Sequence, residues 1–362
     1  MSSTMGDFAG ILPGEWVALI TPMQEKRGPC SNEIDFSKFE RIIQEQADAG
    51  VRKFLVAGTT GQSPVLTDEE HFAVAKWAYN TIKRINPNFN VMIGAGSNAT
   101  NQAISLSQEL CTIADDIILL HVTGYYNNPN PIGLKMHYEE IAKNVKAPIV
   151  IYNVPGRTSS DITKIDGEDD ISVVVSLSKI NSIIGIKYAR PKALHIVEEI
   201  VKNTNPEKFK VMSGNDDEYY DFLHLGAHGI ISAAMNVAPK PFINIGNVQA
   251  MDVKRSEQEY INPLIKAVYA PGTKNPEALG YMFNTELRSP LLNINTFLQN
   301  ESLKSFKEVV ENAKLSAAYL ATTLQIDSII SKFFYDESDV LLPLAKECFK
   351  ERDKTRVGSP FH

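Results

Sequence analysis

Short runs of Val, Ile, Leu and other apolar residues recur along the first two thirds of the chain, with stretches of helical periodicity between them. The runs are continuous rather than alternating, which is typical of parallel strands buried on both faces. Repeated strand–helix alternation predicts an α/β fold, a (β/α)₈ (TIM) barrel over residues 1–255. The eight predicted strands are Trp16–Thr21, Phe54–Ala57, Val91–Ala95, Ile117–Val122, Ile149–Val154, Ile183–Ile186, Val211–Ser213 and Ile230–Ala233.

The segments between these runs carry helix signals. Residues 36–47 place an apolar residue every three or four positions, and Gly50 is expected to end that helix. Thr67 and Glu70 have the spacing of a capping box at a helix N-terminus. Pro131 is typical of the first helical position.

A doubly wound open sheet is the competing fold. Its nucleotide-binding fingerprint needs three glycines after a strand, and Gly94 and Gly96 have no third partner. The last third of the chain is rich in helix-forming residues, especially 303–324 and 340–352. We therefore expect residues 256–362 to form a C-terminal helical appendage.

Composition narrows the class of protein. The 362 residues are 43% hydrophobic and carry a net charge of -7, and no Lys/Arg run suggests a nucleic-acid partner. The three cysteines form no CxxC pair, which favours a reducing compartment. No signal peptide or apolar run long enough to span a membrane is evident. The sequence predicts a cytoplasmic protein without membrane association.

Active sites of such barrels form where the strands end. Lys187 ends an isoleucine-rich strand, where desolvation would lower the pKa of its amine and free it to attack a carbonyl. A strand-end lysine that reaches solvent is about as frequent. Lys53 and Lys210, at strand starts, illustrate that alternative.

Other strand ends offer groups that could bind or protonate a substrate. Thr59 and Thr60 lie between glycines, where backbone N–H groups and hydroxyls can hold a carboxylate. Tyr152 could act as an acid or base, and Arg157 could pair with a carboxylate. Each of these residues also has a purely structural interpretation. Thr59 and Thr60 could belong to an ordinary polar turn, Tyr152 could pack in the barrel, and Arg157 could form a surface ion pair.

Two clusters of acidic or histidine residues are not interpreted as metal sites. Acidic residues 216–218 at a helix start usually complement the helix dipole rather than bind metal. His224 and His228 have i,i+4 spacing but lack the glutamate of zinc proteases. We expect neither a metal nor a cofactor.

Taken together, these motifs resemble the superfamily of dihydrodipicolinate synthase and N-acetylneuraminate lyase, class I pyruvate-dependent aldolases. The resemblance covers residues 16–239, and the segment around Arg157 is similar to the synthase branch in particular. The motifs, in chain order, are Gly58–Gly61, Gly96–Leu106, Tyr125–Asn127, Tyr152–Thr158, Gly185–Lys187, Ser213–Asp216 and Gly229–Ala238.

The resemblance implies a role for each catalytic candidate. Lys187 would form an imine with pyruvate, and Thr59 and Thr60 would hold the pyruvate carboxylate. Tyr152 would relay protons with Thr59 and with Tyr126, which in the family reaches the neighbouring subunit's site.

Substrate-binding roles follow in the same way. Arg157 would bind the carboxylate of aspartate semialdehyde, the second substrate. Ile231 matches a position whose carbonyl faces the lysine, and Gly214 belongs to the motif that lines the substrate site. A homodimer or homotetramer is implied.

The chain departs from the family pattern at two positions, Gln62 and Tyr188, where acidic residues are usual. Because of these two departures, a related (sister) enzyme that uses the same imine, either another pyruvate-dependent aldolase or a sugar-acid dehydratase, is an alternative function. A non-catalytic barrel that binds a 2-oxo acid is the alternative from another class. A binder would need no proton relay, which favours an enzyme.

In sensitive relatives lysine inhibits at the tight dimer interface. The matching positions are Ser63, Asp68, Asn98, Gln102 and Tyr125. Gln102 replaces a glutamate that faces the ammonium group, and loss of that charge weakens the contact by ~1 kcal/mol or more. We expect weak or absent inhibition by lysine.

Overall fold

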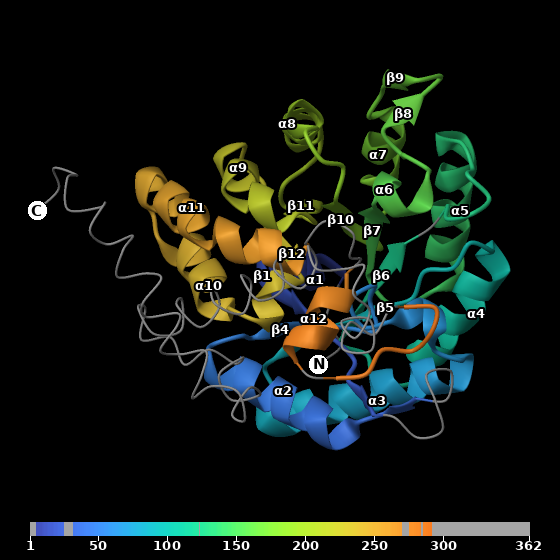
Figure 1. Ribbon diagram of the computed structural model, residues 1–362. Coiled ribbons are helices and arrows are strands. Elements are labelled where there is room, and N and C mark those ends of the chain that lie inside the picture. Colours follow the sequence, from blue (N-terminus) through green and yellow to red (C-terminus); the bar gives the residue numbers. More distant parts are fainter. Residues whose placement is uncertain (1–4, 25–31, 123, 270–274, 284, 292–362) are drawn as a thin grey trace, which may run out of the picture.

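The computed structural model describes residues 5–24, 32–122, 124–269, 275–283 and 285–291. Eight parallel strands close into a barrel in the order β1-β12-β11-β10-β7-β6-β5-β4, as the sequence predicts (Figure 1). The strands are β1 Gly14–Ala18, β4 Lys53–Val56, β5 Asn90–Gly94, β6 Ile117–Val122, β7 Ile149–Asn153, β10 Ile183–Tyr188, β11 Lys210–Ser213 and β12 Gly229–Ser232.

Two small antiparallel pairs lie outside the barrel and were not predicted. They are β2 Met23–Gln24 with β3 Glu33–Ile34, and β8 Lys164–Ile165 with β9 Glu168–Asp169. Strands of two residues are too short to show a period in the sequence.

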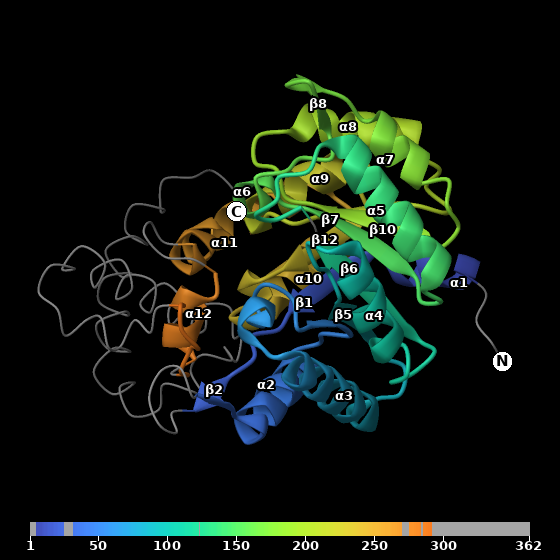
Figure 2. The same ribbon diagram turned by 90° about the vertical axis from the view of Figure 1, so that its right-hand side faces the viewer.

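Helices surround the barrel on its outer side (Figures 1 and 2). The α-helices are α2 Phe36–Asp48, α3 Asp68–Ile85, α4 Thr100–Leu110, α5 Pro131–Asn144, α6 Pro155–Thr158, α7 Ser172–Leu177, α8 Leu194–Asn203, α9 Tyr219–His224, α10 Pro239–Asn247, α11 Met251–Val268 and α12 Glu277–Met282. Three 3₁₀ turns are η1 Ser63–Val65, η2 Asp216–Glu218 and η3 Ala234–Asn236.

The helix signals of the sequence are confirmed. The Thr67 hydroxyl accepts from the Glu70 backbone N–H, and the Glu70 carboxylate accepts from the Thr67 N–H, which completes the capping box of α3. Pro131 occupies the first position of α5, after an Asn130 side chain that caps it.

The apolar residues separate into an inner and an outer core. Outward-facing strand residues such as Phe54 pack against the helices, whereas Trp16, Met92 and Ile184 fill the barrel interior. The short helix α1 Met5–Ile11 closes the amino-terminal end of the barrel, where Phe8 joins the inner core. The opposite end, where the strands terminate, is left for the site.

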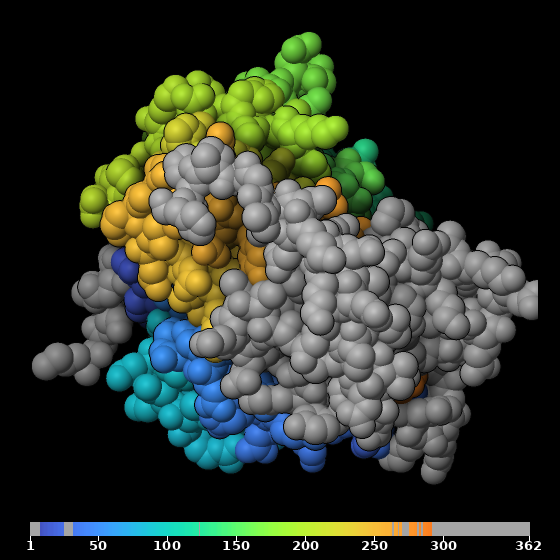
Figure 3. Space-filling model, turned by 60° about the vertical axis from the view of Figure 1, so that its left-hand side comes forward, coloured from blue at the N-terminus to red at the C-terminus, as the bar shows by residue number. Residues whose placement is uncertain are grey.

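The described part of the C-terminal region packs on the barrel. The expected boundary at residues 255/256 falls inside α11, which lies against α9 and α10 and forms a continuous surface with them (Figure 3). Residues 285–287 hydrogen-bond to Met23 and Asn32. The helices predicted at 303–324 and 340–352 lie outside the described residues. None of the helices in the described ranges is long and apolar enough to cross a membrane.

Candidate active site

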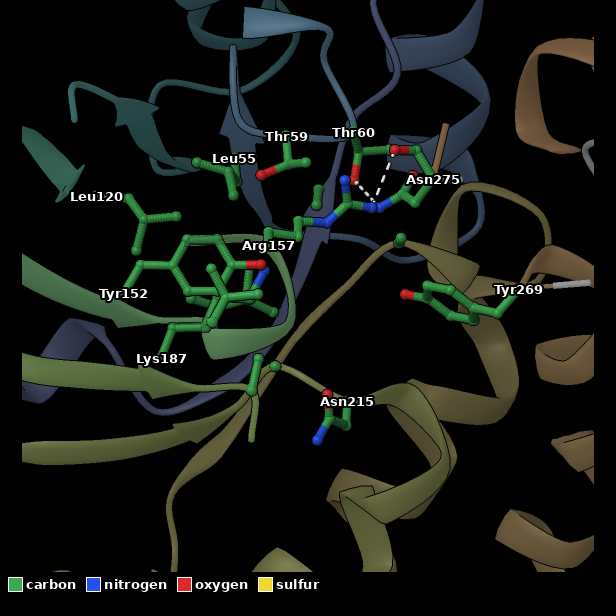
Figure 4. Close-up of a pocket in the computed structure, with 16 residues that line it drawn as sticks. Leu55, Thr59, Thr60, Leu120, Tyr152, Arg157, Lys187, Asn215, Tyr269 and Asn275 are labelled. Carbon is green, nitrogen blue, oxygen red and sulfur yellow. Dashed lines mark hydrogen bonds between the residues drawn. The ribbon is translucent and has the colours of Figure 1, made fainter. Parts of the chain in front are cut away.

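A cavity of about 110 Å³ opens at the end of the barrel where the strands terminate (Figure 4). Residues from seven of the eight barrel strands or the loops that follow them line it, together with two from the C-terminal region. The lining residues are Ala18, Leu55, Thr59, Thr60, Leu120, Tyr152, Val154, Arg157, Lys187, Ala189, Gly214, Asn215, Ile231, Ala233, Tyr269 and Asn275. Five of the sequence-predicted residues, Thr59, Thr60, Tyr152, Arg157 and Lys187, therefore gather in one place, as do Gly214 and Ile231.

Lys187 is buried in this cavity. Strand alternation turns Ile186 and Tyr188 toward the outer helices and Lys187 toward the interior, where its side chain is 6% exposed. The register pairs it with Tyr152 on β7, and Nζ lies 4.4 Å from the centre of the Tyr152 ring. The alternative of an amine that reaches solvent is thus wrong for this lysine.

Gly214 lets the loop after β11 pass close to the lysine. A Cβ added at Gly214 would lie 2.6 Å from the Ala189 Cβ and 3.1 Å from the Lys187 Cε. Carbon atoms do not approach to 2.6 Å without displacement of one of them. The glycine therefore allows the observed packing of the lysine side chain.

Thr59 and Thr60 lie in the turn between β4 and η1. The Thr59 carbonyl accepts from the Gln62 N–H, and Gln62 adopts a left-handed conformation with φ 62°, which makes the turn tight. Thr60 is 3% exposed, and its hydroxyl accepts from the Asn275 side-chain amide at 3.0 Å. This turn presents two hydroxyls to the cavity.

Arg157 reaches the cavity from α6. Its Nη2 donates to the backbone carbonyl of Asn275 at 3.1 Å, which orients the guanidinium beside Thr60 (Figure 4). A guanidinium carries five N–H groups, so it can bind a carboxylate while keeping this bond. The Asn275 side-chain oxygen is buried and has no hydrogen-bond partner in the structure.

Gln62 and Tyr188, the two departures from the family pattern, do not line the cavity. Gln62 is fully buried, donates to the Thr21 carbonyl at 2.8 Å and accepts from the Arg288 N–H at 3.1 Å. The Tyr188 hydroxyl lies 2.9 Å from the Thr163 hydroxyl on the outer side of the barrel, and burial raises the pKa of this phenol to about 12. Both residues have structural partners.

Tyr126 lies away from the cavity of its own chain. It follows β6, has φ 67° and is 94% exposed, and its neighbour Tyr125 is 37% exposed. A tyrosine almost entirely in solvent makes little contact within its own subunit. Its proposed part in the proton relay therefore depends on a second copy of the chain.

Tyr269 and Asn275 were missed by sequence reasoning, which assigned them to an appendage outside the site. The Tyr269 hydroxyl donates to the Asp216 carboxylate at 2.8 Å, and Asp216 also accepts from the Ala234 N–H at 2.9 Å. Burial raises the pKa of the Asp216 carboxyl, and burial and the nearby Asp216 raise the pKa of the Tyr269 phenol. Only the folded chain brings these residues to the barrel mouth.

The acidic segment 216–218 has ordinary partners. Glu218 accepts from the Asn215 amide and from the Lys192 N–H. Across the described ranges, no three His, Cys, Asp or Glu side chains are placed to hold a metal ion.

The positions matched to lysine inhibition lie outside the cavity lining. Gln102 on α4 accepts from the Ser97 hydroxyl at 2.9 Å, and Asp68 is exposed at the start of α3. Ser63 begins η1, and Asn98 and Tyr125 lie in neighbouring loops. The expected weak inhibition stays a prediction, which a dose–response curve with lysine would test.

Comparison with known proteins agrees with the geometry. The model of the dihydrodipicolinate synthetase family matches residues 8–312. A 4-hydroxy-tetrahydrodipicolinate synthase of Kosmotoga olearia is 35% identical over 82% of this chain and 95% of its own.

Solved structures are similar as well. The dihydrodipicolinate synthase of Acinetobacter baumannii complexed with pyruvate is 28% identical, with a TM-score of 0.72 over 84% of this chain and 99% of that one. The enzyme of Aquifex aeolicus is 32% identical, with a TM-score of 0.68 over 82% and 98%.

Proposed function

We propose that this chain, which belongs to the dihydrodipicolinate synthetase family, is a lyase that condenses pyruvate with aspartate semialdehyde through an imine on Lys187, a step of lysine biosynthesis. The observation that carries the proposal is the buried Lys187 amine in a cavity that also contains two threonine hydroxyls and an arginine. Relatives at about 35% identity bear the name 4-hydroxy-tetrahydrodipicolinate synthase.

The first half-reaction uses the amine as a nucleophile. The Lys187 nitrogen attacks the ketone carbon of pyruvate, and the ketone oxygen leaves as water, so that a C=N bond replaces C=O. The imine withdraws electrons from the adjacent methyl group, which loses a proton and becomes an enamine. The enamine carbon then attacks the aldehyde carbon of the second substrate, so that the new C–C bond forms, the aldehyde oxygen takes up a proton and the C=N bond to Lys187 is restored. Attack of the second substrate's own amine on that imine carbon displaces the Lys187 amine, which closes the ring of the product and frees the enzyme.

Each step requires a proton to move, and the position of Tyr152 beside the lysine supports it as the group that moves the proton. Its ring lies against the Lys187 amine, and Thr59 lines the same cavity. A phenol near a reacting nitrogen can give and take a proton within one catalytic cycle. We assign the relay to Tyr152, Thr59 and Tyr126 of a second copy.

Two carboxylates have to be held apart in this reaction. We assign the pyruvate carboxylate to Thr59 and Thr60, which line the cavity together with Ile231 and Lys187. We assign the carboxylate of the second substrate to Arg157, which is held by Asn275. Separate anion sites for the two substrates orient them for C–C bond formation.

No feature of the cavity favours the sister enzymes. Gln62 and Tyr188, the two departures that made the sister enzymes an alternative, do not line the cavity. A non-catalytic binder of 2-oxo acids would need a carboxylate clamp, but not a lysine buried against a tyrosine. The synthase accounts for more of the lining residues than either alternative.

The decisive experiment is turnover of pyruvate and aspartate semialdehyde, followed by a reductase that consumes the product. We expect activity that requires both substrates and disappears in Lys187→Arg, because a guanidinium stays charged and cannot attack. Lys208→Arg, at an exposed position, is the matched control. Turnover with a sugar-derived 2-oxo acid but not with aspartate semialdehyde would reject the synthase in favour of a sister enzyme.

A further inference from the structure

Tyr269 presents a hydrogen-bond acceptor to the cavity. Its hydroxyl proton is engaged by Asp216, whose carboxylate is 1% exposed and cannot turn toward solvent. Because the hydroxyl proton is donated to Asp216, the phenol oxygen can only accept a hydrogen bond from a ligand. In Figure 4 this hydroxyl points toward the space between Arg157 and Asn215.

The two facing walls of the cavity therefore differ in charge and in hydrogen-bonding groups. Arg157 supplies positive charge and donors on the β7 side. Tyr269, with the buried Asp216 behind it, supplies an acceptor and negative charge on the side of β11 and α11. An adjoining cavity of about 600 Å³ shares Tyr269 with the first, and its lining contains the acids Asp216 and Asp217 and one cation, Lys266.

This polarity fits a ligand that carries both charges. In an α-amino acid the carboxylate and the ammonium group are bonded to one carbon. Once Arg157 holds the carboxylate, the ammonium group needs an acceptor at a neighbouring wall, and burying it without one is costly. An aldehyde that lacks the amine gains nothing from Tyr269.

We propose that Tyr269 is a specificity-determining residue, whose hydroxyl, held by Asp216, accepts a hydrogen bond from the ammonium group of the second substrate. The inference rests on the proposed function and assigns to Tyr269 the selectivity of the site for an aldehyde that carries an α-amino group. A site built around a hydrogen bond discriminates strongly against an analogue that lacks the partner.

The test compares two aldehydes in wild-type enzyme and in Tyr269→Phe. Aspartate semialdehyde carries the ammonium group, and succinate semialdehyde has the same chain, carboxylate and aldehyde without it. We expect Tyr269→Phe to lower kcat/KM for aspartate semialdehyde by about 10- to 100-fold, the range for a hydrogen bond to a charged group. For succinate semialdehyde we expect kcat/KM to change by no more than about threefold. Tyr269→Phe should therefore lose most of the wild-type preference for aspartate semialdehyde over succinate semialdehyde.

Tyr79→Phe is the matched control. It removes another tyrosine–aspartate hydrogen bond, from Tyr79 to Asp116 at 2.6 Å, on the outer surface of α3. It should leave both kcat/KM values unchanged. Borohydride trapping with pyruvate should proceed normally in Tyr269→Phe, which shows that the barrel and its lysine are intact.

The outcomes separate the two proposals. Equal losses for both aldehydes would show that Tyr269 only shapes the cavity, and an unchanged kcat/KM for aspartate semialdehyde would remove its role altogether; either result overturns the inference alone. Wild-type enzyme inert toward both aldehydes would defeat the proposed function, and the inference with it.

Discussion

The guanidinium of Arg288 forms a bidentate ion pair with the carboxylate of Glu70, with N–O distances of 2.5 and 2.8 Å. Arg288 also donates to the carbonyls of Val65 and Asn32, and its backbone N–H donates to Gln62. Residue 288 is thereby connected to the turn that carries Thr59 and Thr60, the residues proposed to bind pyruvate.

Arg288→Ala should weaken both the fold and pyruvate binding. Its loss leaves the Val65 and Asn32 carbonyls and the Glu70 carboxylate without this partner, a cost of about 2–4 kcal/mol in unfolding free energy. Freed from Arg288, the turn of Thr59 and Thr60 should hold pyruvate less well, which raises the KM for pyruvate more than it lowers kcat.

Denaturant unfolding and steady-state kinetics measure the two effects of Arg288→Ala. The control is Arg84→Ala, because the Arg84–Glu40 pair is largely exposed and such pairs contribute about 0–1 kcal/mol. A stability loss with an unchanged KM for pyruvate would restrict Arg288 to a structural role.

Lys187 should be the residue modified when the protein is treated with pyruvate and borohydride. Reduction fixes the imine, and peptide mapping by mass should locate the adduct on the peptide that contains Lys187. Lys187→Arg should abolish trapping, and Lys208→Arg should not. An adduct on another lysine, or none in the wild-type protein, would contradict the mechanism.

Gly214→Ala should impair catalysis without unfolding the barrel. The new Cβ would press on Ala189 and on the Lys187 side chain, and a displacement of about 1 Å at a reacting group can cost about 100-fold in rate. We expect kcat to fall by about 10- to 100-fold and trapping by borohydride to slow. Gly10→Ala, where an added Cβ meets no atom within 4 Å, is the control; a kcat within twofold of wild type would show that the lysine tolerates the contact.

Tyr126→Phe should lower turnover while leaving imine formation partly intact, because the phenol is proposed to relay protons in a second copy's site. Mixed assemblies provide the sharper measurement. Subunits with Lys187→Arg and subunits with Tyr126→Phe are each impaired alone, but a mixed dimer would contain one site with both groups intact. Activity should therefore rise on mixing; no rise, or a fully active monomer, would place Tyr126 outside the partner's site.

Acidification should destabilise the protein through two buried histidines. Burial lowers the pKa of His121 to about 3 and that of His137 to about 4, against about 6.5 in the unfolded chain. Between pH 6.5 and 4 the unfolded chain binds protons that the folded chain does not. These histidines therefore stabilise the fold fully above pH 6.5, and their contribution falls as the pH falls, by up to about 1.4 kcal/mol per pH unit for each.

Denaturant unfolding at pH 7, 6 and 5 measures this slope. His137→Gln should make the pH dependence shallower than in wild type, because glutamine does not titrate. His224→Gln, at an exposed position, serves as the control. An identical slope in wild type and His137→Gln would contradict the assignment.

Local patterns in the sequence determined the barrel and most of its mouth. Buried parallel strands are continuous apolar runs, so all eight strands could be found within three residues of their observed ends. Residues just after such strands must meet at one end of the barrel. That rule, with the family resemblance, predicts that Lys187, Tyr152 and Arg157 lie together, as the structure has them.

Tertiary structure alone decided which other residues share the site. Thr60 and Asn275 are 215 positions apart, and Gln62 and Arg288 are 226 apart; no periodicity or spacing rule relates residues so distant. The segment that carries Tyr269 and Asn275 contains Pro271 and Gly272, which indicate only a break between helices. The partners of its polar residues lie on the barrel, far away in the sequence. Contacts of this kind arise when the chain packs back on the barrel mouth, so they become visible only in the folded protein.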